Sequence, residues 1–201
     1  MLTVNTRTQY GAVAIALHWL IALAVIVNIA LGLYFSDLPR SDPDKFMLTQ
    51  LHKSIGLSVL VLSVVRVLWR LVNPVPPLPP SMSRALRVAA RTVQFLLYIL
   101  IVAIPISGWA MVSSSPLGLP TVYFGWFQWP HLSFLADLPR AQKMPLVREF
   151  ATVHVVLAWS AIVLVPVHIA GALYHQLVRR DNVLARMLPR FPGGKARAEI
   201  A

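Results

Sequence analysis

Four of the six histidines lie inside long apolar stretches of this 201-residue chain. They are His18, His52, His154 and His168. The last two share one stretch and are fourteen residues apart, so on a helix they lie on one face, about 21 Å apart along the axis. A histidine inside a bilayer is costly and marks a candidate functional site, and imidazole is a common metal ligand. The spacing predicts two sites at different depths.

The composition is that of a membrane protein. Hydrophobic residues make up 57% of the chain, charged residues 12%, and the mean hydropathy is +0.68. These values are too apolar for an ordinary soluble domain. The chain has no cysteine. This excludes disulfides, thiolate-bound iron–sulfur clusters, thiolate-ligated haem and the covalent attachment of c-type haem.

Four apolar stretches are long enough to cross a bilayer, which takes about 20 residues per helix. They cover residues 11–35, 48–71, 88–112 and 150–178. The fold class we expect is all-α: an integral membrane four-helix bundle. It forms a single transmembrane domain over residues 1–190, followed by a short basic tail over 191–201. The first stretch is too long for a cleaved signal peptide, and no small-residue cleavage site follows it.

The basic residues predict the orientation. An even number of spans puts both termini on one side, together with the connection over residues 73–87. That side carries twelve of the 18 lysines and arginines. The positive-inside rule therefore predicts cytoplasmic termini and a multi-pass protein of the bacterial inner membrane. Topology and attraction to anionic lipids explain the net charge of +11 better than nucleic-acid binding does.

The same topology sorts the histidines by depth. His18 and His168 fall in the inner half of the bundle, and His52 and His154 fall in the outer half. A zinc site would gather its ligands around one point. Two separate pairs of imidazoles suit two haem irons instead. Iron with two axial histidines has no open position, so the pairs predict electron transfer across the membrane.

Other residues on the histidine faces are candidates for binding the cofactor. Gly56 lies one turn from His52, where a porphyrin needs clearance, although a glycine can equally serve helix packing. Arg66 and Arg70 lie at the inner end of the same face and can pair with haem propionates or anchor the helix at the membrane surface. Asn28 is expected to make an interhelical hydrogen bond.

Two connections are distinctive. Residues 73–81 read N-P-V-P-P-L-P-P-S and predict a stiff polyproline spacer. The outer loop over residues 113–145 is rich in aromatic residues. It predicts a segment packed over the bundle mouth, either as an interfacial anchor or as a lid or partner-docking site. His131 in this loop is expected to be interfacial.

Several motifs resemble the bacterial cytochrome b561 family over residues 10–189. They are H-W-L at His18, L-H-K-S-I-G at His52, V-V-R-V-L-W-R-L before the proline-rich link, and V-H-I-A-G-A-L-Y-H-Q-L-V-R-R-D-N-V-L-A-R-M-L-P at the end. The resemblance implies a four-helix bundle with two b-type haems, whose ligands are His18, His52, His154 and His168. Small stand-alone members resemble superoxide oxidases, which pass electrons from superoxide at the outer face to ubiquinone. His175 matches a family histidine near the inner haem.

These observations lead to one main hypothesis and two alternatives. The chain is expected to be a superoxide:ubiquinone oxidoreductase. Lys53 and Arg148, helped by Lys45, would steer the anion to the outer haem, unless they only extend to the membrane surface. His175 would relay protons to ubiquinone. The first alternative is a cytochrome b subunit of a larger membrane dehydrogenase or hydrogenase, fed by a protein partner. The second is a haem-free transporter or scaffold.

Overall fold

The computed structural model describes residues 3–6, 8–181 and 183–188. Four of its helices are long and apolar enough to cross a membrane. They are α1 (Ala12–Asp37), α2 (Asp44–Val72), α3 (Arg84–Ser113) and α5 (Arg140–Tyr174). The predicted tail over 191–201 lies outside the described residues, as do Arg7, Arg190, Lys195 and Arg197 of the charge count.

The four predicted spans are present, but three helices begin earlier than predicted. α2 starts at Asp44, α3 at Arg84 and α5 at Arg140, so each has a polar first turn or more before its apolar part. The apolar pattern indicates only the part of a helix that lies in lipid. In α5 the extension runs through Pro145, which lies near the start of the helix.

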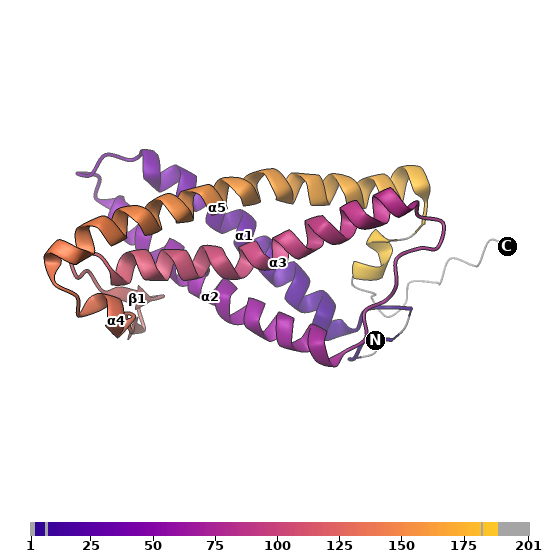
Figure 1. Cartoon of the computed structure of the whole chain (residues 1–201), viewed down its shortest axis with the longest axis horizontal. Helices are drawn as coiled ribbons and strands as arrows, with labels where there is room; N and C mark the ends of the chain where they lie inside the picture. Colours follow the sequence, from indigo (N-terminus) through magenta and orange to yellow (C-terminus); the bar gives the residue numbers. More distant parts are fainter. Residues whose placement is uncertain (1–2, 7, 182, 189–201) are drawn as a thin grey trace.

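The helices form an elongated bundle (Figure 1). The closest packing joins α3 to α5, α1 to α2, and α2 to α3. Many large apolar side chains face outward, for example Leu23, Leu68 and Phe95, at 63%, 57% and 65% exposure. By contrast, the most deeply buried side chains include Ser54, Ser63 and Ser113. This pattern fits a bilayer, where lipid covers apolar faces and small polar residues allow helices to approach.

A small hairpin covers one end of the bundle and adds a β element to the predicted all-α fold. Strand β1 (Thr121–Tyr123) pairs antiparallel with β2 (Phe127–Trp129), and the short helix α4 (Ser133–Ala136) follows. The turn uses Phe124 and Gly125, both at positive φ. Gln50 Oε1 accepts from the Val122 amide at 3.0 Å, and Ser54 Oγ accepts from the Phe124 amide at 3.0 Å. The predicted aromatic segment is therefore attached to α2.

The opposite end holds the start of α1, the link between α2 and α3, and the chain after α5 (Figure 1). There α5 passes into a π-helical turn, His175–Arg179, and the chain continues to a 3-10 helix, Leu184–Met187. Arg179 donates to the Ser81 carbonyl at 3.0 Å, and Arg186 donates to that of Pro77 at 2.7 Å. Trp19 Nε1 donates to the Met187 carbonyl at 2.6 Å. The proline-rich link between α2 and α3 is therefore bound to the chain segment that follows α5, and the two together cover this end of the bundle.

Candidate functional site

The structure brings the four membrane histidines together as the two pairs that depth predicted. The rings of His52 and His154 have centroids 6.2 Å apart, on the side of the hairpin. Those of His18 and His168 are 6.3 Å apart, toward the end that holds the start of α1 and the chain after α5. We call them the hairpin-side pair and the terminus-side pair. In both pairs the rings are close to perpendicular, at 78° and 72°.

Helix α5 supplies one histidine to each pair, and α1 and α2 supply one each. Neither α1 nor α2 is among the helices most closely packed on α5 within the described residues. The imidazoles of each pair therefore meet across helices that are not closely packed on each other. Space between helices at the level of paired ligands is what a large planar cofactor needs.

The hairpin-side histidines have their Nδ1 atoms held by backbone carbonyls. His52 Nδ1 lies 3.1 Å from the Asn28 carbonyl of α1. His154 Nδ1 lies 3.0 Å from both the Ile104 carbonyl and Ser107 Oγ of α3. A carbonyl only accepts hydrogen bonds, so Nδ1 carries the proton in each ring. The lone pair is then on Nε2, which is the arrangement of a neutral metal-ligating histidine.

A glycine also lies against each of these two imidazole rings. A Cβ on Gly32 or on Gly108 would lie 3.1 Å from Cε1 of His52 or His154, tighter than ordinary contact. Each glycine follows its carbonyl residue by four positions, Asn28 and Gly32 in α1, Ile104 and Gly108 in α3. Two helices thus use one local device, a carbonyl and a glycine one turn apart, and we call it the carbonyl–glycine cradle.

The terminus-side pair has different surroundings. Arg66 Nη2 lies 3.5 Å from His18 Nδ1, and Arg66 Nη1 donates to the Ala14 carbonyl at 3.0 Å. The neighbour of this imidazole is thus a cation from α2. Among the described residues, neither His18 nor His168 has a carbonyl hydrogen-bond partner like those of the hairpin-side pair.

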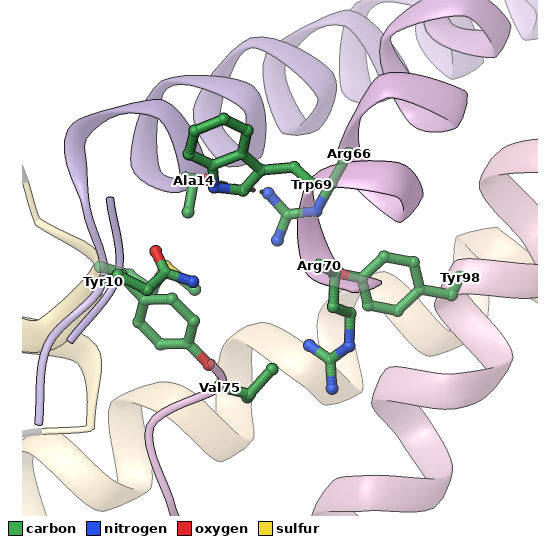
Figure 2. A pocket seen from close by; sticks show the side chains of 9 residues that line it. Tyr10, Ala14, Arg66, Trp69, Arg70, Val75 and Tyr98 are labelled. Carbon is green, nitrogen blue, oxygen red and sulfur yellow. Dashed lines mark hydrogen bonds between the residues drawn. The ribbon is translucent and has the colours of Figure 1, made fainter. Parts of the chain in front are cut away.

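A small cavity of about 20 Å³ lies beside Arg66 (Figure 2). Arg66 and Arg70 both lie over the Tyr98 ring, at 5.6 and 5.1 Å from its centroid. Trp69 Nε1 is buried and has no acceptor among the described residues. Burial raises the pKa of the Tyr10 phenol, which keeps it protonated. The cavity wall thus presents hydrogen-bond donors and positive charge, which suit a carboxylate.

The two pairs fit bis-histidine metal ligation. A ligating nitrogen lies about 2 Å from its metal, so two rings sharing one ion have centroids about 6 Å apart. Both observed separations agree with this value. Among the described residues no three His, Asp or Glu side chains cluster around one point, as a zinc site would require. The donor-lined cavity beside Arg66, the residue that approaches His18, further suits a cofactor that carries carboxylates.

The other predicted site residues are less uniformly placed. The open side of Gly56 faces the Asn28 amide, 3.5 Å from a Cβ, and not an imidazole. Lys53 Nζ donates to the Pro120 carbonyl at 3.0 Å, and Lys45 Nζ donates to that of Leu38 at 2.5 Å. Arg148 is exposed on α5. These three cations do not line one pocket, and two of them hold loop carbonyls.

The loop histidine and His175 have polar neighbours. Burial, followed by the charges of Lys53 and Lys143, lowers the pKa of His131. The His131 side chain lines a pocket beside Trp129. His175 is buried, and its Nδ1 lies 2.6 Å from Asp181 Oδ2.

The sequence motifs did not predict the residues that position the four histidines. Gly32 of α1 and Gly108 of α3, which approach His52 and His154, were not among the predicted site residues. Asn28 contributes its backbone carbonyl across the interface, whereas its side-chain Oδ1 is buried without a partner among the described residues. A glycine at a similar depth to a histidine on another helix was the available signal.

Four membrane helices with facing histidines define the class of membrane electron carriers of the cytochrome b type. The sequence pattern of the family described as "Prokaryotic cytochrome b561" matches residues 9–190, and the chain belongs to this family. Membership implies haem b as the cofactor and a multi-pass location in a prokaryotic membrane.

Curated relatives cover nearly the whole chain. It is 40% identical over 185 residues to cytochrome b561 homolog 2 of Escherichia coli K12, covering 92% of this chain and 93% of that protein. It is 28% identical to a protein of Yersinia pestis named "Probable superoxide oxidase CybB", over 92% and 98% of the two chains. Cytochrome b561 homolog 1 of E. coli K12 is 27% identical, over 90% and 98%.

Proposed function

We propose that this protein binds two haem b groups and passes electrons from the outer side of the bacterial inner membrane to ubiquinone. The ligands are His52 with His154 for the outer haem and His18 with His168 for the inner one. One observation carries this proposal. The imidazole rings face each other in two separate pairs, and α5 contributes one ring to each pair. The terminus side faces the cytoplasm, as the distribution of lysine and arginine indicates.

The chain's residues hold and tune the cofactors. Each haem, when bound, supplies an iron that takes up and releases one electron. The carbonyls of Asn28 and Ile104 orient the outer ligands through Nδ1–H. Arg66 and Arg70, with the indole of Trp69, bind carboxylates at the inner end of the bundle.

The electron donor we propose is superoxide, in keeping with the name of the Yersinia relative. Two superoxide anions each lose one electron and become dioxygen, and one ubiquinone gains both electrons and two protons. On the donor side, burial and then the charges of Lys53 and Lys143 lower the pKa of His131. Together with Arg148, these two lysines give the hairpin end local positive charge for attracting a small anion.

We propose that ubiquinone binds at the opposite end, next to His175. This residue is seven positions after His168, about 10 Å along the helix and nearer the cytoplasm. A quinone head can reach this depth from the lipid. The imidazole is suited to deliver a proton to a quinone oxygen.

One surface favours a second candidate function, a cytochrome b subunit that receives electrons from a protein. Trp126 at the hairpin is 84% exposed, Leu117 is 72% and Phe134 is 70%. Such a surface can dock a partner, although it can also lie in the membrane interface.

The test is made on purified protein in detergent. We expect two haems per chain with absorption spectra of low-spin bis-imidazole iron. Superoxide added to the purified chain alone should reduce both haems, and added ubiquinone should reoxidise them. Two haems without reduction by superoxide would instead favour the subunit function, and a chain without haem would contradict both.

A further inference from the structure

His175 and Asp181 form a buried acid–base pair where α5 ends. Their side chains are 10% and 8% exposed, and His175 Nδ1 lies 2.6 Å from Asp181 Oδ2. The described residues contain no other side-chain contact of this kind between an acid and a base. Removing an acid and a base from water is costly unless they are paired, so the local structure must maintain the contact.

The backbone is irregular at the point that forms this pair. A helix continuing as α beyond Tyr174 would carry Asp181 onward along the helix and away from His175. Instead the chain makes a π-turn over His175–Arg179, and Arg180 takes a left-handed conformation at φ 52. The Asp181 amide then bonds to the His175 carbonyl at 3.3 Å. Single π-turns and left-handed non-glycine residues are both strained features that concentrate at functional sites.

The neighbouring arginine does not neutralise the pair. Arg179 from the same turn donates to the Ser81 carbonyl. Tyr174 packs edge-on against the imidazole, with centroids 5.7 Å apart. Within the described part of the chain, His175 is therefore the side chain to which the Asp181 carboxylate is hydrogen-bonded. As an acceptor it keeps the proton on Nδ1 and leaves Nε2 as the end that exchanges protons.

Two further oxygens in this region lack donors. Asp181 Oδ1 and Gln176 Oε1 are buried and have no hydrogen-bond partner among the described residues. Buried acceptors normally find a donor, either water or a ligand hydroxyl. Both a water chain from the cytoplasm and the hydroxyl of a reduced quinone supply such donors.

We propose that Asp181 is the positioning residue for His175 and that the pair delivers protons to the quinone. The inference rests on the proposed function and deepens it. His175 gives the proton on Nε2 to a quinone oxygen and regains one from water on the cytoplasmic side. Two such transfers, with the two electrons, convert the quinone to the hydroquinone. The carboxylate holds the ring orientation and balances the charge of the imidazolium in between.

The test compares Asp181→Asn and Asp181→Glu in the full haem-loaded protein. The protein is first reduced chemically, and its reoxidation by ubiquinone is followed, so the identity of the natural donor does not enter. We expect Asp181→Asn to slow reoxidation roughly 10- to 100-fold, with haem content unchanged. Asp181→Glu should restore part of the rate. Asp137→Asn, an exposed carboxylate next to α4 at the other end, is the matched control and should match wild type.

A second readout separates positioning from simple structural support. Nitrogen NMR of labelled His175 should show the proton on Nδ1 in wild type and a shift toward Nε2 in Asp181→Asn. An Asp181→Asn protein that reoxidises at the wild-type rate, or that keeps the wild-type tautomer, would overturn the inference and leave the proposed function intact. Wild-type protein that does not pass electrons to ubiquinone would overturn both.

Discussion

The two histidine pairs have nearly the same ring separation, 6.2 and 6.3 Å, but opposite electrostatic surroundings. On the hairpin side the Nδ1 atoms meet carbonyl oxygens. On the terminus side His18 Nδ1 meets a guanidinium. Hydrogen bonds to carbonyls raise the basicity of a ligand and favour the oxidised metal, whereas a nearby cation favours the reduced one. The difference predicts a lower potential on the hairpin side and electron flow toward the terminus side.

The largest effect should come from removing a ligand. His52→Ala and His154→Ala should each lose the outer haem and keep the inner one, and His18→Ala and His168→Ala should do the reverse. Haem-to-protein ratios and redox titrations of the four variants measure this. Loss of the same haem in His18→Ala and His154→Ala would break the pairing on which the comparison rests.

The next effect tests the carbonyl–glycine cradle. Gly32→Ala and Gly108→Ala place a methyl group against a hairpin-side imidazole, so the outer haem should be lost or its spectrum perturbed while the inner one is unchanged. Elsewhere in a helix, alanine is favoured over glycine by about 0.5–1 kcal/mol. Ala30→Val, at an exposed position of α1, adds carbon atoms without touching a histidine and is the control. Equal effects on both haems would show that the cradle is not specific to the hairpin side.

Arg66 should set the potential of the inner haem. Arg66→Gln removes a cation next to His18, and a unit charge at this range in a protein interior changes a one-electron potential by on the order of 100 mV. The inner potential should fall and the outer one should stay. Arg70→Gln changes the same cavity without contacting a histidine and should shift the potential less. A spectroscopically monitored redox titration resolves the two haems. An unchanged inner potential would contradict the idea that the charge of Arg66 distinguishes the two histidine pairs.

The smallest effect concerns the cations at the hairpin end. Neutralising Lys45, Lys53 and Arg148 together should slow reduction by superoxide several-fold and weaken its salt dependence, because steering by surface charge is screened by salt. Reduction by a neutral reductant should not change, since the outer haem itself is untouched. Stopped-flow measurements of the rate of haem reduction by each reductant test this prediction. Equal slowing would instead indicate damage to the hairpin that Lys53 holds through the Pro120 carbonyl.

The sequence predicted the features that bilayer thickness and helix periodicity control. The four spans follow from apolar length, and the matching of His18 with His168 and of His52 with His154 follows from chain direction alone. Helix ends outside the lipid were predicted less well, because the polar first turns of α2 and α5 look like loop. The attachment of the hairpin to α2 through Gln50 and Ser54 could not be predicted, since neither bilayer thickness nor helix periodicity determines how a loop folds back onto a helix.

The ligand surroundings were harder to predict, because most of them are backbone. The carbonyls of Asn28 and Ile104 have no signature in the side-chain sequence. The sequence points to Gly56 because it lies one turn from His52 on the same helix, whereas Gly32, which approaches that ring, is on another helix. The His175–Asp181 contact depends on a left-handed arginine, a conformation that residue type disfavours.

The contribution of α5 to both histidine pairs has a consequence for biogenesis. This helix is the last of the four to leave the ribosome, so a nascent chain that has inserted three helices has only half of each ligand set. Under the proposed ligation, both haem sites become complete only when this single segment arrives. The proposal therefore makes haem loading a late event, and a truncation before α5 should yield a chain that binds no haem.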